Sequence, residues 1–247
     1  MLLCYCGTAF GWGKSGHDAI AYIAECNLTP KAKKNIEKYL DGRSIVYYAS
    51  WMDVYRHTPA YKVTSGWHGD RVDADGKYVP NAKGDALQCI EEAISRLKDY
   101  RSLDDSTVLV SIKYLVHLVG DMHCPVHVKY PWYKNFKFDL NGRPSEFHSF
   151  GDGGVLDLNH RWGYVEYRHQ LDRLTKKEIR AVTAGTPRDW LEESARDCRV
   201  IYEWTKPGQT FNKDEARDLL NTVHPFAEEQ ILKAGYRLAA VLNQLFG

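Results

Sequence analysis

Apolar residues recur at helical spacing through most of the chain, and the strongest repeat lies near its middle. One face of that segment carries Val108, Ile112, Leu115 and Val119. An acidic run precedes the repeat, and the proline at position 125 should end it, because proline lacks the amide hydrogen that a helix interior needs. We therefore predict a long apolar helix that ends at this proline.

Start and stop signals predict further helices on both sides of this segment. Capping residues or Thr-Pro pairs open several of them, and an Asp-Gly pair closes one. The expected helices are residues 30–41, residues 44–57, a helix that begins at 85, one after the capping box at 175–178, one from 186 through 201, and one from about 225 to 246.

Two turn-forming pairs interrupt the helical pattern. Asp75-Gly76 and Asn141-Gly142 are typical of β-hairpins, so one or two small β-ribbons are expected among the helices. No internal repeat, low-complexity segment or linker divides the chain, and 247 residues are enough to bury a large core. The pattern predicts one mainly helical domain, of the all-α class.

Composition and charge narrow the function classes. Hydrophobic residues at 44% and charged residues at 26% are ordinary for a globular protein and argue against a disordered chain. The 33 basic and 32 acidic residues leave a net charge of only +1, which disfavours a protein that holds duplex nucleic acid through a broad basic field. Any chemistry on nucleic acid must therefore be local.

The first eleven residues contain no charged side chain and end in Ala9-Phe10-Gly11, with the small residues that signal peptidase prefers. We interpret residues 1–11 as the remnant of a secretory signal peptide, with an ordinary apolar segment as the alternative, and residues 12–247 as a secreted or periplasmic domain. No other stretch reaches about 18 apolar residues, so no membrane span is predicted. Cleavage would leave four cysteines, compatible with up to two disulfides: Cys26, Cys89, Cys124 and Cys198.

Histidine and aspartate pairs suggest a metal centre. His117 and Asp121 are four residues apart on the most apolar helix, as two ligands of one metal require, although a buried hydrogen-bonded pair would show the same spacing. His148 and Asp152 repeat the pattern. Asp53 and His68 add a further carboxylate and imidazole. Nitrogen and oxygen donors without a cysteine motif suit zinc, and their number implies more than one ion.

Several motifs in the same order resemble the zinc-dependent single-strand-specific nucleases of fungi, plants and bacteria, whose wider superfamily includes bacterial phospholipases C. The matching segments cover nearly the whole of residues 12–247. They are Trp12-Gly13-Lys14-Ser15-Gly16-His17, Ser50-Trp51-Met52-Asp53-Val54-Tyr55-Arg56, Trp67-His68, the run from His117 to His127, Phe147-His148 with Asp152, and Ala234-Gly235-Tyr236-Arg237-Leu238-Ala239.

The resemblance implies a nuclease and phospholipase C-like helical fold with three zinc ions. The first ion would take Asp53, His68, His117 and Asp121, and the second His127, His148 and Asp152. The third would take His17, the shared Asp121, and the free amine and carbonyl of Trp12. Since an acylated tryptophan has no basic amine, this third site implies signal cleavage between Gly11 and Trp12.

The resemblance also implies catalytic roles for Asp53, Arg56 and Asp121. Asp121 would be shared by the ions that hold the attacking hydroxide, and Asp53 would orient that hydroxide or take its proton. Arg56 lies one helical turn after Asp53, and its planar guanidinium suits two phosphate oxygens at once. A surface salt bridge is the alternative role for Arg56.

Substrate binding is where the chain departs from its fungal relatives. They have an aromatic residue directly after the ligand matching His68, whereas Gly69 stands here, and the tryptophan usual before the second-site aspartate is Gly151. Exposed aromatic rings stack on bases, so Trp132 and Tyr133 are candidate replacements, with packing of the β-ribbon as the alternative. Asn135 ends the same segment and is grouped with them.

These expectations describe a monomeric, secreted zinc phosphodiesterase that cuts single-stranded DNA and RNA and removes 3′-phosphates from nucleotides. A zinc-dependent phospholipase C is the enzymatic alternative, disfavoured by the short step from Trp12 to His17 and by aspartate at 152. An inactive zinc-stabilised binding module is disfavoured because every ligand and Arg56 are present. His123 is expected beside the metals or in solvent, and no metal role is expected for His57, His160, His169 and His224.

Overall fold

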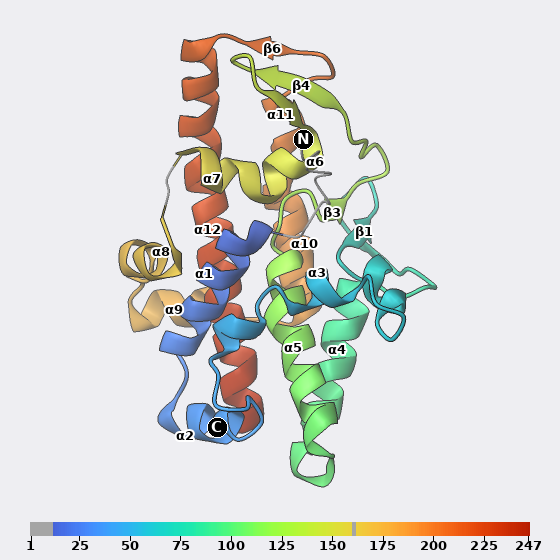
Figure 1. The fold of residues 1–247 in the computed structure, drawn as a ribbon, viewed down its shortest axis with the longest axis vertical. Helices are drawn as coiled ribbons and strands as arrows, with labels where there is room; N and C mark the ends of the chain where they lie inside the picture. Colours follow the sequence, from blue (N-terminus) through green and yellow to red (C-terminus); the bar gives the residue numbers. More distant parts are fainter. Residues whose placement is uncertain (1–11, 160–161) are drawn as a thin grey trace, which may run out of the picture.

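A computed structural model describes residues 12–159 and 162–247, so the predicted signal segment lies outside the described part. Helices dominate, and short strands form two small sheets (Figure 1). The helices are α1 (Gly13–Cys26), α2 (Pro30–Glu37), α3 (Trp51–Tyr55), α4 (Ala86–Leu97), α5 (Asp105–Asp121), α6 (Phe147–Ser149), α7 (Val155–Asn159), α8 (Tyr164–Leu171), α9 (Lys176–Val182), α10 (Pro187–Cys198), α11 (Ile201–Trp204) and α12 (Lys213–Phe246). The strands are β1 (Asp70–Val72), β2 (Tyr78–Val79), β3 (Val128–Lys129), β4 (Lys137–Leu140), β5 (Pro144–Glu146) and β6 (Thr210–Phe211). This mainly helical single domain confirms the predicted class.

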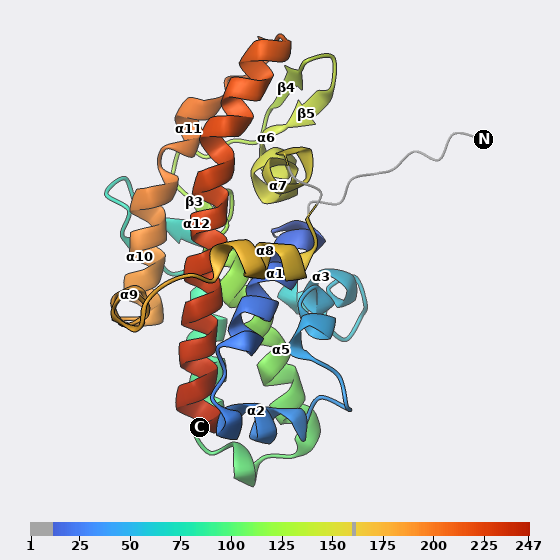
Figure 2. The same cartoon turned by 90° about the vertical axis from the view of Figure 1, so that its left-hand side faces the viewer.

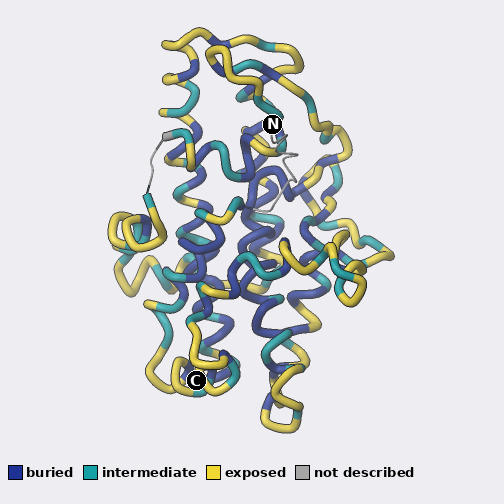
Figure 3. The backbone as a smooth tube through the Cα atoms, viewed as in Figure 1, coloured by how far each residue is buried: buried dark blue, intermediate teal, exposed yellow. Residues whose placement is uncertain are grey.

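Helix α5 is the centre of the molecule. The side chain of Asp104 caps its start by accepting a hydrogen bond from the amide of Thr107 at 2.9 Å. Every residue from Leu115 to Asp121 is buried, because α1, α3, α4 and α12 all pack on this helix (Figures 1 and 3). A helix that is covered on all sides can place polar side chains in the protein interior only if something satisfies them.

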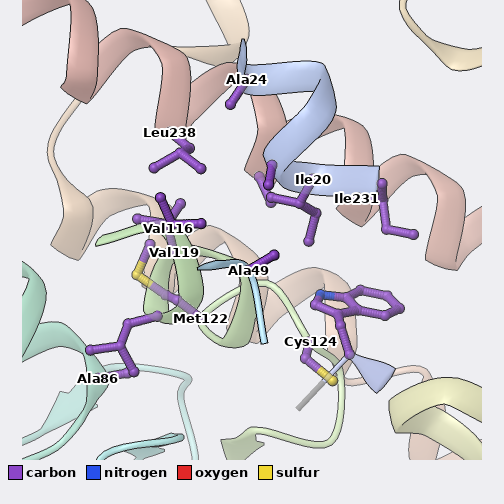
Figure 4. Close-up of a cluster of buried hydrophobic side chains, with 14 of the residues drawn as sticks. Ile20, Ala24, Ala49, Ala86, Val116, Val119, Met122, Cys124, Ile231 and Leu238 are labelled. Atoms are coloured by element: carbon purple, nitrogen blue, oxygen red, sulfur yellow. The ribbon is translucent and has the colours of Figure 1, made fainter. Parts of the chain in front are cut away.

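The apolar packing that surrounds α5 is continuous across the helices. Figure 4 shows Val116 and Val119 of α5 pointing toward Leu238 of α12, with Ile20 of α1 beside Ile231. All five side chains are fully buried. The long helix α12 packs along α1, as the two views of the ribbon show (Figures 1 and 2). This rigid frame fixes where α1 and α5 present their histidines.

Two predicted helices differ from the structure at their ends, and two keep their predicted starts. Helix α2 ends at Glu37 rather than 41, because Asp41 and Gly42 both adopt positive φ in the turn that follows. The helix predicted through Ile201 stops at Cys198, and Ile201 opens α11 instead. The predicted starts at Asp85 and Thr175 are confirmed by side-chain caps.

The single helix predicted over residues 44–57 is wrong. The segment forms a 3-10 turn, η1 (Ile45–Tyr48), and then the short helix α3. Between them the carbonyl of Ala49 accepts a hydrogen bond from Nδ1 of His117 at 2.7 Å. The backbone is therefore interrupted at the point where it serves a buried histidine of α5.

The last helix begins twelve residues earlier than predicted, at Lys213 rather than about 225. The side chain of Asn212 accepts hydrogen bonds from the amides of Asp214 and Glu215, and the carboxylate of Glu215 accepts one from the amide of Asn212. Pro225 lies inside the helix and removes one amide donor. Its unpaired partner, the carbonyl of Asn221, belongs to an exposed residue that water can reach.

Both predicted β-ribbons are present, and each gains a third strand from a distant segment. Strand β1 pairs with β2 antiparallel and with β3 parallel, and β4 pairs with β5 antiparallel and with β6 parallel. The β1 to β3 pairing places Asp70 opposite Val128. This register brings the residues just before the two strands, His68 and His127, close together.

Among the described residues, none of the helices combines the length and apolar character that crossing a membrane requires.

Candidate metal centre

The predicted ligands come from segments far apart in the chain and converge around α5. Helix α1 supplies His17, helix α3 supplies Asp53, and α5 supplies His117 and Asp121. The loops before β1 and β3 supply His68 and His127. The remaining pair, His148 and Asp152, comes from the segment after β5.

Asp121 lies at the middle of the cluster, where each carboxylate oxygen faces different imidazoles. Its Oδ1 is 3.3 Å from Nε2 of His17. Its Oδ2 is 3.0 Å from Nδ1 of His68 and 3.2 Å from Nε2 of His117. A carboxylate that is approached from both sides in this way can be shared between neighbouring metal ions.

Asp53 faces the same imidazoles from the other side. Its Oδ1 is 3.6 Å from Nδ1 of His68 and 3.7 Å from Nε2 of His117, too far for hydrogen bonds. Two donors bound to one tetrahedral zinc ion at about 2.0–2.1 Å lie about 3.4 Å apart. The spacings around Asp53 and Asp121 therefore match those of atoms that share an ion.

A second group of donors lies beside this one. Nε2 of His127 is 3.3 Å from Oδ1 of Asp152, and Nε2 of His148 is 4.0 Å from its Oδ2. Residues 150–154 form a π turn, η4 (Phe150–Gly154), between α6 and α7, which widens the helix where Asp152 is presented. A Cβ at Gly151 would approach Cγ1 of Val126 to 2.5 Å, so the tryptophan of the relatives has no room here.

The sequence interpretation missed Cys124, which touches this second group. Its buried thiol lies 3.4 Å from Oδ1 of Asp152 and donates to it, and burial raises the pKa of the thiol well above its usual value. Cys124, His127 and Asp152 have ligand atoms within 4.8 Å of one another. Only its position between Asp121 and His127 in the chain could have indicated that Cys124 contacts these donors.

Hydrogen bonds from behind orient three of the imidazoles. Nδ1 of His117 donates to the carbonyl of Ala49, and Nδ1 of His127 donates to the carbonyl of His68. Nδ1 of His148 contacts the hydroxyl of Tyr133 at 2.7 Å. Each of these bonds leaves Nε2 pointing into the cluster, the arrangement that metal-binding histidines use.

His17 lies at the edge of the first group. Its ring stacks on that of His117 at 4.0 Å between centroids, and neither of its nitrogens has a hydrogen-bond partner. His17, Asp53 and His117 also have ligand atoms within 4.8 Å of one another, so distance alone does not separate the sets that the resemblance implies. Trp12 is fully buried directly before α1, with its indole nitrogen unpaired.

Charge and burial set the protonation of the metal-free cluster. Burial disfavours the His117 cation, but the carboxylates of Asp121 and Asp53 outweigh this and raise its pKa to about 9. Burial also opposes ionisation of Asp121, but His117 and His127 hold its pKa well below the usual value. Burial and the charge of His127 lower the pKa of His148 to about 3. Protons therefore occupy part of the cluster, and metal binding must displace them.

The cluster leaves many buried polar atoms without hydrogen-bond partners. An unpaired buried polar atom costs about 1–3 kcal/mol, so proteins rarely keep several together without a ligand. The donor types, spacings and unsatisfied atoms all fit a zinc centre. The unpaired atoms are Nδ1 and Nε2 of His17, Oδ1 of Asp53, Nε2 of His68, Oδ1 of Asp121 and Nε2 of His127.

The predicted substrate residues lie around this cluster in different settings. Arg56 has Nη1 3.7 Å from Oδ1 of Asp53, and its side chain is only 12% exposed, so it is not a simple surface ion pair. Trp132 is 41% exposed, and its ring stacks on Tyr130 at 4.8 Å. Tyr133 contacts His148, and Asn135 accepts a hydrogen bond from the amide of His148 at 2.9 Å.

The segment after His68 provides no aromatic platform. A Cβ at Gly69 would approach the carbonyl of His127 to 2.7 Å, because β1 and β3 pair immediately beyond it. Asp70 is fully buried and accepts a hydrogen bond from the amide of Leu87 at 2.9 Å. It supports the start of α4 and is not exposed to a base.

His123 was expected beside the metals or in solvent, and it lies in neither place. It is fully buried, its Nδ1 donates to the carbonyl of Val119 at 2.7 Å, and its Nε2 accepts from Nη1 of Arg237 at 2.8 Å. Burial and the charge of Arg237 hold its pKa well below the usual value. His57 and His169 are exposed, His224 is buried, and His160 lies outside the described residues.

The four cysteines that the sequence left open as disulfide partners are free thiols in the described structure. Cys26 is exposed, and the other three are buried.

The chain is similar to known nucleases over nearly its whole length. The family model for S1/P1 Nuclease matches residues 12–247. Nuclease P1 of Penicillium citrinum is 30% identical over 96% of this chain and 98% of its own length. Nuclease S1 of Aspergillus oryzae is 25% identical over 95% and 91%, and Endonuclease 2 of Arabidopsis thaliana 24% identical over 96% and 91%. The chain therefore belongs to the S1/P1 nuclease family of hydrolytic enzymes.

Proposed function

We propose that the chain is a secreted, monomeric zinc phosphodiesterase that cuts single-stranded DNA and RNA to products with 5′-phosphates, and that it also removes 3′-phosphates from nucleotides. The observation that supports this most strongly is the buried cluster around Asp121, whose unpaired nitrogens and oxygens need cations. Membership of a nuclease family supplies the class of reaction.

We assign three zinc ions to the cluster. One is held by Asp53, His68, His117 and Asp121, and a second by His127, His148 and Asp152. The third is held by His17, Asp121, and the amine and carbonyl of Trp12. The distances of 3.0–3.7 Å from Asp53 and Asp121 to the rings of His68 and His117 support the first set. The separation of 3.3 Å between His127 and Asp152 supports the second.

The third site depends on processing of the chain. Trp12 is buried at the start of α1, one turn before His17, and only a free amine there can bind a metal. We therefore propose that residues 1–11 are removed and that the mature domain begins at Trp12. Sequencing the N-terminus of the secreted protein tests this, and any other first residue contradicts it.

The chain's own groups complete the reaction. Bound zinc supplies an activated water and a positive charge that offsets the charge of the phosphate. Asp53 has an unpaired Oδ1, which can orient the attacking water or take its proton. Arg56 lies beside Asp53 and can donate two hydrogen bonds to phosphate oxygens in the transition state. The carbonyl of Ala49 and the hydroxyl of Tyr133 hold the rings of His117 and His148 in place.

An assay of the mature, zinc-loaded protein tests the proposal. We expect cleavage of single-stranded DNA and RNA and release of phosphate from 3′-nucleotides, all abolished by a chelator and restored by zinc. Phosphatidylcholine should not be hydrolysed. Replacing the exposed His169 by alanine provides a matched control, because it removes an imidazole outside the cluster. Activity on the lipid alone would contradict the nuclease assignment, and activity on nothing would indicate a binding module.

A further inference from the structure

A second cavity lies against the wall of the metal centre. Its volume is about 880 Å³, and η1, α3 and α5 form much of its lining. Helix α3 separates the two sites: Trp51, Val54 and Tyr55 face the cavity, whereas Asp53 faces the metal ligands. On α5, Lys113 of the cavity is four residues before His117, which is about 6 Å along the helix axis.

Lys113 is the first sign that this cavity receives an anion. Its side chain is only 9% exposed. Its ammonium lies 4.7 Å from the ring centre of Tyr48 and 4.4 Å from that of Trp51. The carboxylate of Asp41, which lines the same cavity, favours the charged form of this ammonium, and the two form no ion pair within 4.0 Å in the described part of the chain. Ring faces offset only part of the cost of burying a cation, so the group is prepared for an anionic partner.

Ser50 is the second, independent sign. It lines the same cavity, and its hydroxyl is buried without a hydrogen-bond partner. A hydroxyl and an ammonium at one cavity wall are donors that a phosphate group accepts from at the same time. Together Ser50 and Lys113 place an unpaired hydroxyl and an ammonium at one wall of the cavity.

The mouth of the cavity adds aromatic rings. Tyr47 is 62% exposed, with the guanidinium of Arg43 4.2 Å above its ring. Tyr55 is 43% exposed and stacks on Trp51 at 4.8 Å. Exposed rings beside cations are how proteins hold single-stranded nucleic acid without reading its sequence.

Charge favours the same ligand. Three cationic side chains line the cavity, Lys14, Arg43 and Lys113, against the carboxylates of Asp18 and Asp41. Lys14 and Asp18 are bonded to each other, which leaves Arg43 and Lys113 against the single carboxylate of Asp41. The lining therefore carries a net positive charge.

We propose that this cavity, on the other side of α3 from the metal ligands, binds a further nucleotide of the single strand whose phosphodiester lies at the metal centre. Lys113 and Ser50 hold its phosphate, and the more exposed Tyr47 stacks on its base. This proposal rests on the proposed nuclease function. It implies that long strands bind more tightly than dinucleotides, although both are cleaved by the same groups.

The test compares a 20-nucleotide strand of thymidine with the dinucleotide of thymidine as substrates. Three single variants are used, Lys113→Gln, Tyr47→Ala and Arg43→Glu, and the last two change exposed residues. Each should raise KM for the long strand about 10-fold and leave kcat and KM for the dinucleotide unchanged. Lys213→Gln at the start of α12 is the matched control and should change neither.

Binding without turnover separates this proposal from the proposed function. Metal-free protein with chelator is titrated with the fluorescent 20-nucleotide strand, and wild type should bind about 10-fold more tightly than each variant. Equal binding by wild type and the Tyr47 and Arg43 variants would overturn the proposal, even if the enzyme cleaves every substrate. A change with Lys113→Gln but none with Tyr47→Ala would also overturn it, because it would indicate an anion site without a base platform.

Discussion

Two buried polar clusters meet on α5 and its C-terminal extension, and they differ in one respect. At the metal centre, rings and carboxylates lie at 3.0–3.7 Å with several atoms unpaired. A few residues on, His123 and Arg237 form a cluster in which each polar atom has a partner. Arg237 donates from Nε to the carbonyl of Val182, from Nη1 to His123 and from Nη2 to Glu193 at 2.6 Å.

A ligand site and a structural network can be distinguished by their hydrogen bonds. Both clusters contain histidine in the apolar interior, so burial and residue type do not separate them. The number of unpaired polar atoms does separate them. In a structural network, hydrogen bonds within the protein offset the cost of burying polar atoms, whereas in a metal site the bound ion offsets it. By this criterion we assign His17 and His68, but not His123, to the proposed metal centre.

The largest effect should come from Asp121→Asn. The amide keeps the shape but loses the negative charge that faces His17, His68 and His117. We expect zinc content to fall and kcat/KM on single-stranded DNA to drop by more than about 100-fold, the upper range for residues that only support a ligand. Elemental analysis and steady-state kinetics measure both. Full activity with full zinc content would show that Asp121 is not shared by the ions.

Next in size is Arg56→Ala, which should keep all the metal and lose about 100-fold in kcat, as removal of one preorganised transition-state donor does. Arg56 lies beside Asp53 without being a ligand. Arg56→Lys is the matched control and should recover part of kcat because it restores the charge but not the planar fork. Loss of zinc from Arg56→Ala would indicate that Arg56 helps to hold the metal ligands in place.

Arg237→Met should lower stability without lowering the zinc content. It leaves His123 and the carbonyl of Val182 buried without their donor, which should cost about 3 kcal/mol of the free energy of unfolding. Zinc content per folded chain should not change. Chemical denaturation of the metal-free protein measures the cost, and elemental analysis measures the metal. Selective loss of zinc in a stably folded variant would contradict the division drawn here.

The last effect should appear only as a pH dependence of stability and concerns Asp70, whose pKa burial raises from the usual 3.8 to about 8. The unfolded chain ionises near pH 4 while the folded chain keeps the proton, so this group lowers stability as pH rises from about 4 to 8. Asp70→Asn keeps the acceptor for Leu87 and removes this dependence. Its stability relative to wild type should rise by about 1 kcal/mol per pH unit over this range, measured without metal. A constant difference would show that Asp70 is ionised in the fold.

The sequence was most informative where spacing is local. The period of Val108 to Val119 predicted α5, and the four-residue steps from His117 to Asp121 and from His148 to Asp152 predicted pairs that the structure brings together. Family resemblance then linked pairs that lie far apart in the chain. These features follow from helix geometry and side-chain type alone.

Tertiary contacts decided what the sequence did not show. The break between η1 and α3 follows from the bond of Ala49 to His117, a partner 68 residues away. The parallel strands β3 and β6, the contact of Cys124 with Asp152 and the bond from Tyr133 to His148 have no local signal either. By contrast, the start of α12 has a local signal, the capping residues Asn212 and Glu215. The prediction of a start near Pro225 overlooked this signal.

The zinc content of the mature protein tests whether the buried cluster around Asp121 is a three-zinc centre. The mature protein that begins at Trp12 should retain three zinc ions per chain after exhaustive dialysis, and chelation should remove the metal and the activity on single-stranded DNA together. The same measurement on His123→Asn should also give three, because His123 belongs to the satisfied network. Full nuclease activity in protein that holds no zinc would contradict the account.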